Sequence, residues 1–190
     1  MKKIIFFSFF LLFIACDDGD LQIETIDFDD ISIQMCDPVS ADDSNLLFKI
    51  NDAEALILEL QDGAITNVVS EDGEPTSFDL SASSTTRLTY RTFSGTITSD
   101  YFCNDIPVVD PSVVEEIVAG GGQLLITTTI NENDGDDTLT TYIHTIQLSN
   151  ISFLTSENVR ITNLAVNNFG TVSTTEAVVE ETVEGEDTQG

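Results

Sequence analysis

The sequence predicts an all-β domain built as an antiparallel β-sandwich of the jelly-roll or Greek-key kind, with a β-barrel as the alternative. Short β-rich segments are separated by turn signals at intervals of roughly ten residues, which is typical of such folds. No internal repeat of fixed period is present, which argues against a solenoid or a propeller. With 190 residues, the chain is long enough for one domain with a substantial core.

The N-terminal part contains several expected strands. They cover residues 22–28, 31–36, 46–50, 54–61 and 64–69. The last two are predicted to form a hairpin, because Asp62 and Gly63 supply the positive φ angles that a two-residue type I′ turn requires. Another turn is expected at Glu71–Pro75.

Residues 85–93 alternate as a strand does. The alternation places Leu88 and Tyr90 on one face and Arg87 and Arg91 on the other. We expect the two arginines to form ion pairs with surrounding acids, and anion binding is the alternative.

Residues 110–120 are predicted to form one short helix. Asp110 is a suitable N-cap, Pro111 fits the first helical position, and Gly120 could end the helix. An extended conformation of the valines in this segment is the alternative.

The clearest hairpin joins residues 123–131 to residues 138–148 around Asp134 and Gly135. A two-residue turn there pairs Ile130 with Leu139, Ile126 with Ile143, Leu125 with His144 and Thr127 with Tyr142. Closing strands are expected at 151–154 and 159–166.

The composition divides the chain into four parts. We expect a signal peptide at 1–15, a linker at 16–22, the β-sandwich at 23–170 and a disordered acidic tail at 171–190, where aromatic residues are absent and acids accumulate.

The first fifteen residues have the pattern of a secretory signal peptide. Lys2 and Lys3 precede about eleven nearly unbroken apolar residues, which fits a signal sequence and falls short of the roughly twenty residues that span a bilayer. We therefore expect this segment to be removed. A buried N-terminal strand is the alternative.

Residues 12–16, LFIAC, resemble the lipobox of bacterial lipoproteins, and the acidic run from Asp17 resembles the signal that sends lipoproteins of Bacteroidota to the outer face of the outer membrane. The chain, including the segment 101–107, is similar to uncharacterised flavobacterial lipoproteins. The resemblance implies acylation of Cys16, for example by palmitate. It also implies that outer-membrane lipid is the partner of Cys16 and that the body faces the cell exterior. Two or three acyl chains suffice for stable anchoring.

The chain carries 34 acidic and 6 basic residues, for a formal net charge of −28. Charge of this size disfavours nucleic acid and anionic lipid as partners. It suits a protein adapted to a salty exterior, and adaptation to divalent cations is the alternative.

Cys36 and Cys103 are the cysteines that remain after Cys16. In an exported protein we expect them to form a disulfide, which would contribute about 4 kcal/mol in the chain-entropy model. Zinc binding is disfavoured, because structural zinc sites need four ligands in short-spaced pairs.

Motifs for catalysis are missing from the sequence. His144 is the single histidine, and we expect a structural imidazole bonded to Tyr142 or to a neighbouring carbonyl. No motif places a serine or cysteine nucleophile beside a base. A glycosidase-like hydrolase needs only two suitably spaced carboxylates, so this class stays open as the alternative.

Acidic turns are candidate calcium sites, since calcium takes six to eight oxygen ligands. The candidate ligands are Asp27, Asp29, Asp30, Asp134, Asp136 and Asp137. Solvated acidic turns are the alternative, and the EF-hand pattern fails because Ile130 stands at its first ligand position. No other cofactor is expected.

Asp137, Thr138 and Leu139 resemble the O-glycosylation acceptor of Bacteroidota, which makes Thr138 a candidate modification site. Taken together, the sequence predicts a lipid-anchored, non-enzymatic surface module that binds a protein or glycan ligand. A carboxylate-based hydrolase acting on an extracellular polymer is the alternative.

Overall fold

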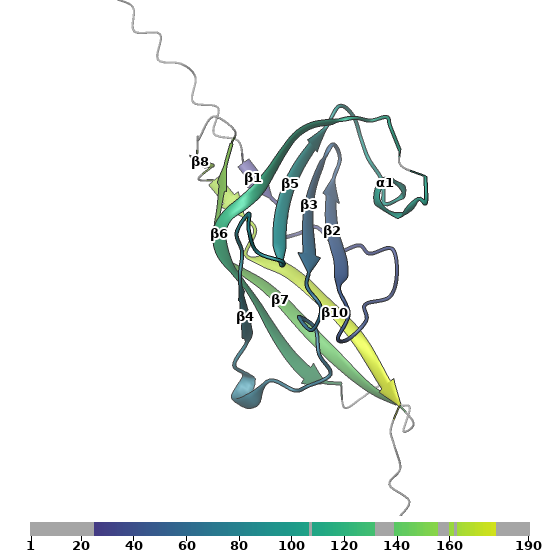
Figure 1. Cartoon of the computed structure of the whole chain (residues 1–190), viewed down its shortest axis with the longest axis vertical. Coiled ribbons are helices and arrows are strands. Elements are labelled where there is room, and N and C mark those ends of the chain that lie inside the picture. Colours follow the sequence, from purple (N-terminus) through teal and green to yellow (C-terminus); the bar gives the residue numbers. More distant parts are fainter. Residues whose placement is uncertain (1–24, 107, 132–138, 156–159, 162, 178–190) are drawn as a thin grey trace, which may run out of the picture.

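The computed structural model describes residues 25–106, 108–131, 139–155, 160–161 and 163–177. Short strands, two long strands and two single helical turns make up this part of the chain (Figure 1). The elements are β1 Thr25–Asp27, β2 Asn45–Asn51, β3 Glu54–Leu60, the 3-10 turn η1 Glu71–Gly73, β4 Thr76–Asp79, β5 Arg87–Phe93, α1 Asp100–Cys103, β6 Val113–Ile130, β7 Leu139–Leu154, β8 Arg160–Ile161, β9 Asn163–Ala165 and β10 Asn168–Ala177.

Eight antiparallel strands form one continuous sheet, and this confirms the predicted all-β, sandwich-like class. The main order is β10-β7-β6-β5-β3-β2, with β4 beside β6 and β8 beside β7, while β1 and β9 form a separate parallel pair. Most neighbours in the sheet are also neighbours along the chain. The connectivity is therefore mainly a meander, which is simpler than the jelly-roll or Greek-key route expected from the sequence.

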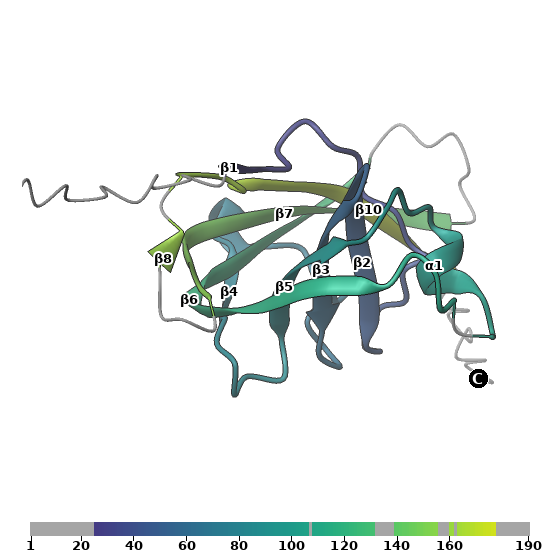
Figure 2. The same cartoon turned by 90° about the horizontal axis from the view of Figure 1, so that it is seen from above.

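The long strand β6 carries the sheet from one layer into the other. Its first part pairs with β5, its later part pairs with β4, and β7 runs along its other edge. Between these parts the register with β7 shifts twice, once between Ala119 and Gly121 and once between Gly121 and Gln123. Such bulges bend a strand and increase its twist. The two halves of the sheet therefore cross over each other, as Figures 1 and 2 show.

The main core lies between these two halves. Leu56, Leu58 and Tyr90 reach it from one half, and Ile126 and Ile146 reach it from the other. All five side chains are at least 97% buried. Alternate residues of each strand face this core, which is the usual pattern of a sandwich layer.

A second, smaller core covers the outer face of β2, β3 and β5. Phe48 and Phe93 point away from the main core and meet Tyr101 and Phe102 of α1. The ring centroids of Phe48 and Phe102 are 4.5 Å apart, and those of Phe93 and Tyr101 are 4.7 Å apart. The single turn of α1 thus acts as a cover for this face.

A disulfide holds this cover in place and confirms the predicted pairing of Cys36 with Cys103. The two sulfur atoms are 2.08 Å apart and the residues are separated by 67 positions. Closing a loop of this length contributes about 4 kcal/mol in the chain-entropy model.

The helix predicted for residues 110–120 is wrong. Most of this segment belongs to β6, where Ile117 and Ala119 point into the core and Val114 is 68% exposed. A helical face would have buried the valines together. Pairing with β5 imposes the period of two instead, and it sets Glu116 opposite Arg91.

The hairpin predicted around Asp62 and Gly63 is also wrong. A turn does form there, with Gly63 at φ +72°. However, β3 pairs with β2 through the Asp52 turn, and it pairs with β5 on its other edge. Both edges of β3 are therefore occupied, and no edge is left for residues 64–69 to pair with.

The hairpin of β6 and β7 is confirmed, but its predicted register is wrong by three residues. Ile130 pairs with Tyr142 and Ile126 pairs with Ile146. The predicted two-residue turn at Asp134 and Gly135 was tied to the expected register. Residues 132–138, which make the connection, lie outside the described residues.

The ends of the domain differ in part from the prediction. In 22–28 the structure describes residues 25–28, of which Thr25–Asp27 form β1, and 31–36 contributes a single bridge between Gln34 and Phe48. The predicted tail begins too early, because β10 continues to Ala177 with Val172 and Thr174 buried against the core. Residues 1–15, 16–22 and 178–190 lie outside the described residues.

Among the three glycines at the bend of β6, Gly122 has the least room for a side chain. Its φ is +133°, and a Cβ atom there would lie 3.0 Å from the Cα of Ile151. We expect Gly122→Ala to lower the free energy of unfolding by about 2 kcal/mol in urea titrations. Gly120→Ala is the matched control, since its Cβ would meet its nearest neighbour at 3.6 Å. Equal losses in the two variants would contradict this explanation of the bend.

Candidate functional site

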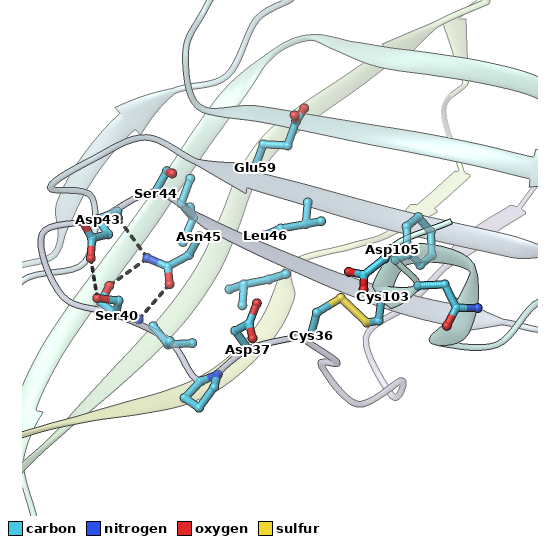
Figure 3. A pocket seen from close by; sticks show the side chains of 16 residues that line it. Cys36, Asp37, Ser40, Asp43, Ser44, Asn45, Leu46, Glu59, Cys103 and Asp105 are labelled. Atoms are coloured by element: carbon cyan, nitrogen blue, oxygen red, sulfur yellow. Dashed lines mark hydrogen bonds between the residues drawn. A yellow bond between two sulfur atoms is a disulfide. The ribbon is translucent and has the colours of Figure 1, made fainter. Parts of the chain in front are cut away.

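An open depression of about 750 Å³ lies beside β2. Residues 36–47 form one wall, and the end of α1 with the residues after it forms another. Figure 3 shows the Cys36–Cys103 disulfide at one end of this depression and the loop around Ser40 at the other. The disulfide therefore joins two walls that are far apart in the sequence.

Hydrogen bonds fix the loop at the far end of the depression. The side-chain amide of Asn45 donates to the carbonyl of Ser40 at 2.8 Å and accepts from the Ser40 N–H at 2.9 Å. The hydroxyl of Ser40 also donates to the carboxylate of Asp43 at 2.7 Å. Because Asn45 begins β2, this network ties the loop to the sheet. The wall is thus set in place before any ligand arrives.

The depression is rich in hydrogen-bond acceptors. Four carboxylates line it, from Asp37, Asp43, Glu59 and Asp105, and no lysine or arginine does. Three of these residues are exposed and Glu59 is half-buried. Carboxylates of this kind accept hydrogen bonds from hydroxyl, amide or ammonium groups.

A smaller groove of about 280 Å³ adjoins the depression on the outer face of the sheet. Leu46, Glu59 and Phe102 line both hollows. The groove also contains Arg87 and Arg91, which project from β5 on the face away from the core. Depression and groove together form one continuous candidate surface.

Both arginines of the groove are ion-paired, as the sequence predicted. Arg87 Nη2 lies 3.0 Å from the carboxylate of Glu59 on β3. Arg91 donates from Nε and Nη2 to a single carboxylate oxygen of Glu116 on β6. The pairing follows from the sheet register, which sets Arg87 opposite Glu59 and Arg91 opposite Glu116.

His144 lies outside both hollows and is structural. Its ring is fully buried, with Nδ1 2.9 Å from Thr128 Oγ1 and Nε2 2.8 Å from Thr174 Oγ1. The hydroxyl of Thr174 donates to Asn67, so Nε2 must carry a proton and donate to Thr174. Nδ1 then accepts from Thr128. The prediction of a structural imidazole is confirmed, although its partners are threonines rather than Tyr142 or a carbonyl.

A buried lysine, Lys49, lies close to Asp27, Asp29 and Asp30, for which the sequence predicted a calcium site. Lys49 is 1% exposed, and its ammonium donates to the carbonyls of Phe28 at 2.6 Å and Asn168 at 2.9 Å. Burial lowers the pKa of Lys49, and the charges of Asp29, Asp30 and Asp27 oppose that shift. The carboxylates of the acidic turn therefore favour the charged form of Lys49.

No three histidine, cysteine, aspartate or glutamate side chains are grouped to hold a metal ion in the part of the chain that the structure describes. The calcium role of Asp27, Asp29 and Asp30 stays a prediction. Asp29 accepts a hydrogen bond from the backbone N–H of Asn168 at 2.9 Å. This bond fastens the acidic turn to the start of β10.

Several predicted site residues lie outside the described residues. These are the lipidation candidate Cys16, the glycosylation candidate Thr138 and the calcium candidates Asp134, Asp136 and Asp137. Their roles stay predictions. Sequence reasoning missed Lys49, whose signal was a lysine within the apolar segment Leu46–Ile50.

The chain matches no protein-family model, no curated protein and no solved structure. Among the described helices, none has the length and apolar character needed to cross a bilayer.

The burial of His144 predicts a stability change at mildly acidic pH. Burial lowers the pKa of His144 below its ordinary value, so the unfolded chain takes up a proton near pH 6.5 while the folded chain does not. The free energy of unfolding should therefore fall as the pH drops below about 6.5. Urea unfolding of the wild type and of His144→Gln at pH 7.5 and 5.5 measures this effect. The variant should lose less stability over the interval, and parallel pH profiles would count against a neutral, buried imidazole.

Proposed function

We propose that the protein is a lipid-anchored, non-enzymatic binding module on the outer surface of a bacterial cell. The observation that carries the binding role is the open surface made of the depression and the adjoining groove. Its walls are fixed by the disulfide and by the Asn45 network, and preformed walls reduce the entropy that a ligand loses on binding. The anchor and the cellular location rest on the resemblance of LFIAC to a lipobox.

The placement of this surface supports the proposal. In both overall views β1 lies toward one side of the molecule and α1 toward the other (Figures 1 and 2). The anchor would precede β1, whereas α1 and the residues after it form a wall of the depression. A body held near β1 leaves the depression accessible to an extracellular ligand.

The alternative function is hydrolysis of an extracellular polymer by two carboxylates. The four carboxylates of the depression favour this class, because such an enzyme needs a carboxylate pair beside its substrate. Its general acid, however, depends on an apolar environment that keeps a carboxyl group protonated. Three of the four carboxylates are exposed and Glu59 pairs with Arg87, so binding is the better supported role.

Acylation of Cys16 is tested by growing the native host with labelled palmitate. We expect the wild type to carry the label, to sediment with envelopes and to be cleaved by protease added to intact cells, because acyl chains anchor it outside. Cys16→Ser should lose the label and leave the envelope fraction. The double variant Cys36→Ser/Cys103→Ser is the matched thiol control and should keep the label. Sedimentation of unlabelled Cys16→Ser with envelopes would contradict the proposed anchor.

Binding at the depression is tested by placing a photo-crosslinking amino acid at Ser44 of the full chain in living cells. Ser44 is exposed and lines the depression, so irradiation should attach an extracellular macromolecule there. The control position is Ser83, which is exposed and does not line the depression or the groove. Equal adduct yields at the two positions would contradict the binding role of this surface.

A further inference from the structure

The groove beside α1 carries chemistry that narrows the ligand class, and the inference below rests on the proposed binding function. Its charged members are two arginine–carboxylate pairs, Arg87 with Glu59 and Arg91 with Glu116. The groove is thus formally neutral, although the chain as a whole has a net charge of −28. Neutrality here distinguishes the groove from the acidic depression beside it.

The two pairs present donors and acceptors at fixed positions. Arg87 donates through Nη2, and Arg91 donates through Nε and Nη2. A guanidinium has five N–H donors and a carboxylate about four lone-pair sites, so each pair has hydrogen-bonding capacity beyond the bonds named here. A guanidinium is planar and holds its donors in a rigid fork. Each pair therefore offers N–H groups and oxygen atoms side by side, which is what adjacent hydroxyl groups need, since a hydroxyl both donates and accepts.

The spacing of the pairs indicates an extended ligand. Arg87 and Arg91 are four residues apart on β5, which corresponds to about 13 Å along a strand. Thr89 lies between them on the same face and is 6% exposed. A ligand that reaches both pairs must run along β5 and repeat its hydroxyl groups over that distance.

Apolar side chains complete the walls of the groove. Leu46 is 41% exposed, Phe102 is half-buried, and Val118 lies on β6 beside Thr89. Binding sites for small polar molecules commonly combine such apolar walls with a few fixed polar groups. Sugar rings have both features, because they carry hydroxyl groups at the edge and C–H groups on the faces.

The charges of the chain and of the groove favour a neutral ligand over an anionic polymer or a cationic peptide. An anionic polymer would approach a strongly negative body and meet arginines that are already neutralised. A cationic peptide would have to displace the arginines from their carboxylates. A neutral ligand meets neither obstacle.

We propose that the groove binds a neutral glycan chain, whose hydroxyl groups hydrogen-bond to both arginine–carboxylate pairs and whose ring faces pack on Phe102 and Leu46. Longer oligosaccharides bind more tightly than disaccharides, because only they reach both pairs. Exposed ion pairs contribute about 0–1 kcal/mol to stability, so these pairs can be altered without unfolding the protein.

The test uses the full-length lipoprotein in detergent on an array of immobilised oligosaccharides. The array carries neutral gluco-, xylo-, manno- and galacto-oligosaccharides of increasing length, together with uronic-acid and sulfated oligosaccharides. We expect binding to a neutral series. The affinity should change less than about twofold up to about 0.5 M salt, because no net charge is neutralised.

Variants assign the binding to the groove. Arg87→Gln and Arg91→Gln should each weaken binding about tenfold, as expected for the loss of one or two hydrogen bonds. Arg91→Lys should weaken it similarly, because a lysine keeps the charge and lacks the planar fork. Arg160→Gln is the control, since Arg160 is exposed on β8 and does not line the groove. Thermal unfolding of each variant at the wild-type temperature shows that the fold is intact.

Three results would overturn the inference. Neutral binding that survives in both glutamine variants would place the ligand elsewhere. Binding restricted to uronic-acid or sulfated sugars and retained in Arg91→Lys would show recognition of an anion. Absence of all saccharide binding together with protein adducts at Ser44 would identify a protein ligand, and the proposed binding function would then stand without this inference. If Ser44 gave no more adducts than Ser83, the proposed binding function itself would be contradicted.

Discussion

The bend of β6 is the constraint on which the rest of the structure depends. One strand serves both halves of the sheet, and it changes partner from β5 to β4 where three consecutive glycines, 120–122, bring it close to β7. Because the two halves then face each other, their apolar sides bury one another. The outer face of β2, β3 and β5 is left for other uses: α1 covers part of it, and the groove occupies the rest.

Local patterns in the sequence predicted the features that depend on neighbouring residues. The alternation of residues 85–93 placed Arg87 and Arg91 on the face away from Leu88, and their ion pairs followed from the excess of acids. The disulfide could be predicted because Cys36 and Cys103 are the two cysteines outside the predicted signal and lipobox, and export was expected. These predictions needed no knowledge of which strands lie side by side.

Features that depend on strand partners could not be predicted in the same way. The helix prediction for residues 110–120 relied on caps and on the spacing of the valines, whereas pairing with β5 decided the outcome. The Asp62–Gly63 turn was correct, but both edges of β3 were already taken. The register of β6 with β7 is defined by the pairs along the two strands, such as Ile126 with Ile146, and not by the Asp134–Gly135 turn signal. Likewise, the depression is lined by segments far apart in the sequence, 36–47 and 102–105, which the disulfide joins.

Lys49 would have a mechanical consequence under the N-terminal lipid anchor proposed above. Its ammonium joins the carbonyl of Phe28, just after β1, to the carbonyl of Asn168 at the start of β10, while its own backbone belongs to β2. Tension on the tether, such as drag from flowing medium, would therefore be shared at once between both outer strands of the main sheet. The first strand to feel such a load would then be braced by β2 and β10 through one ammonium group.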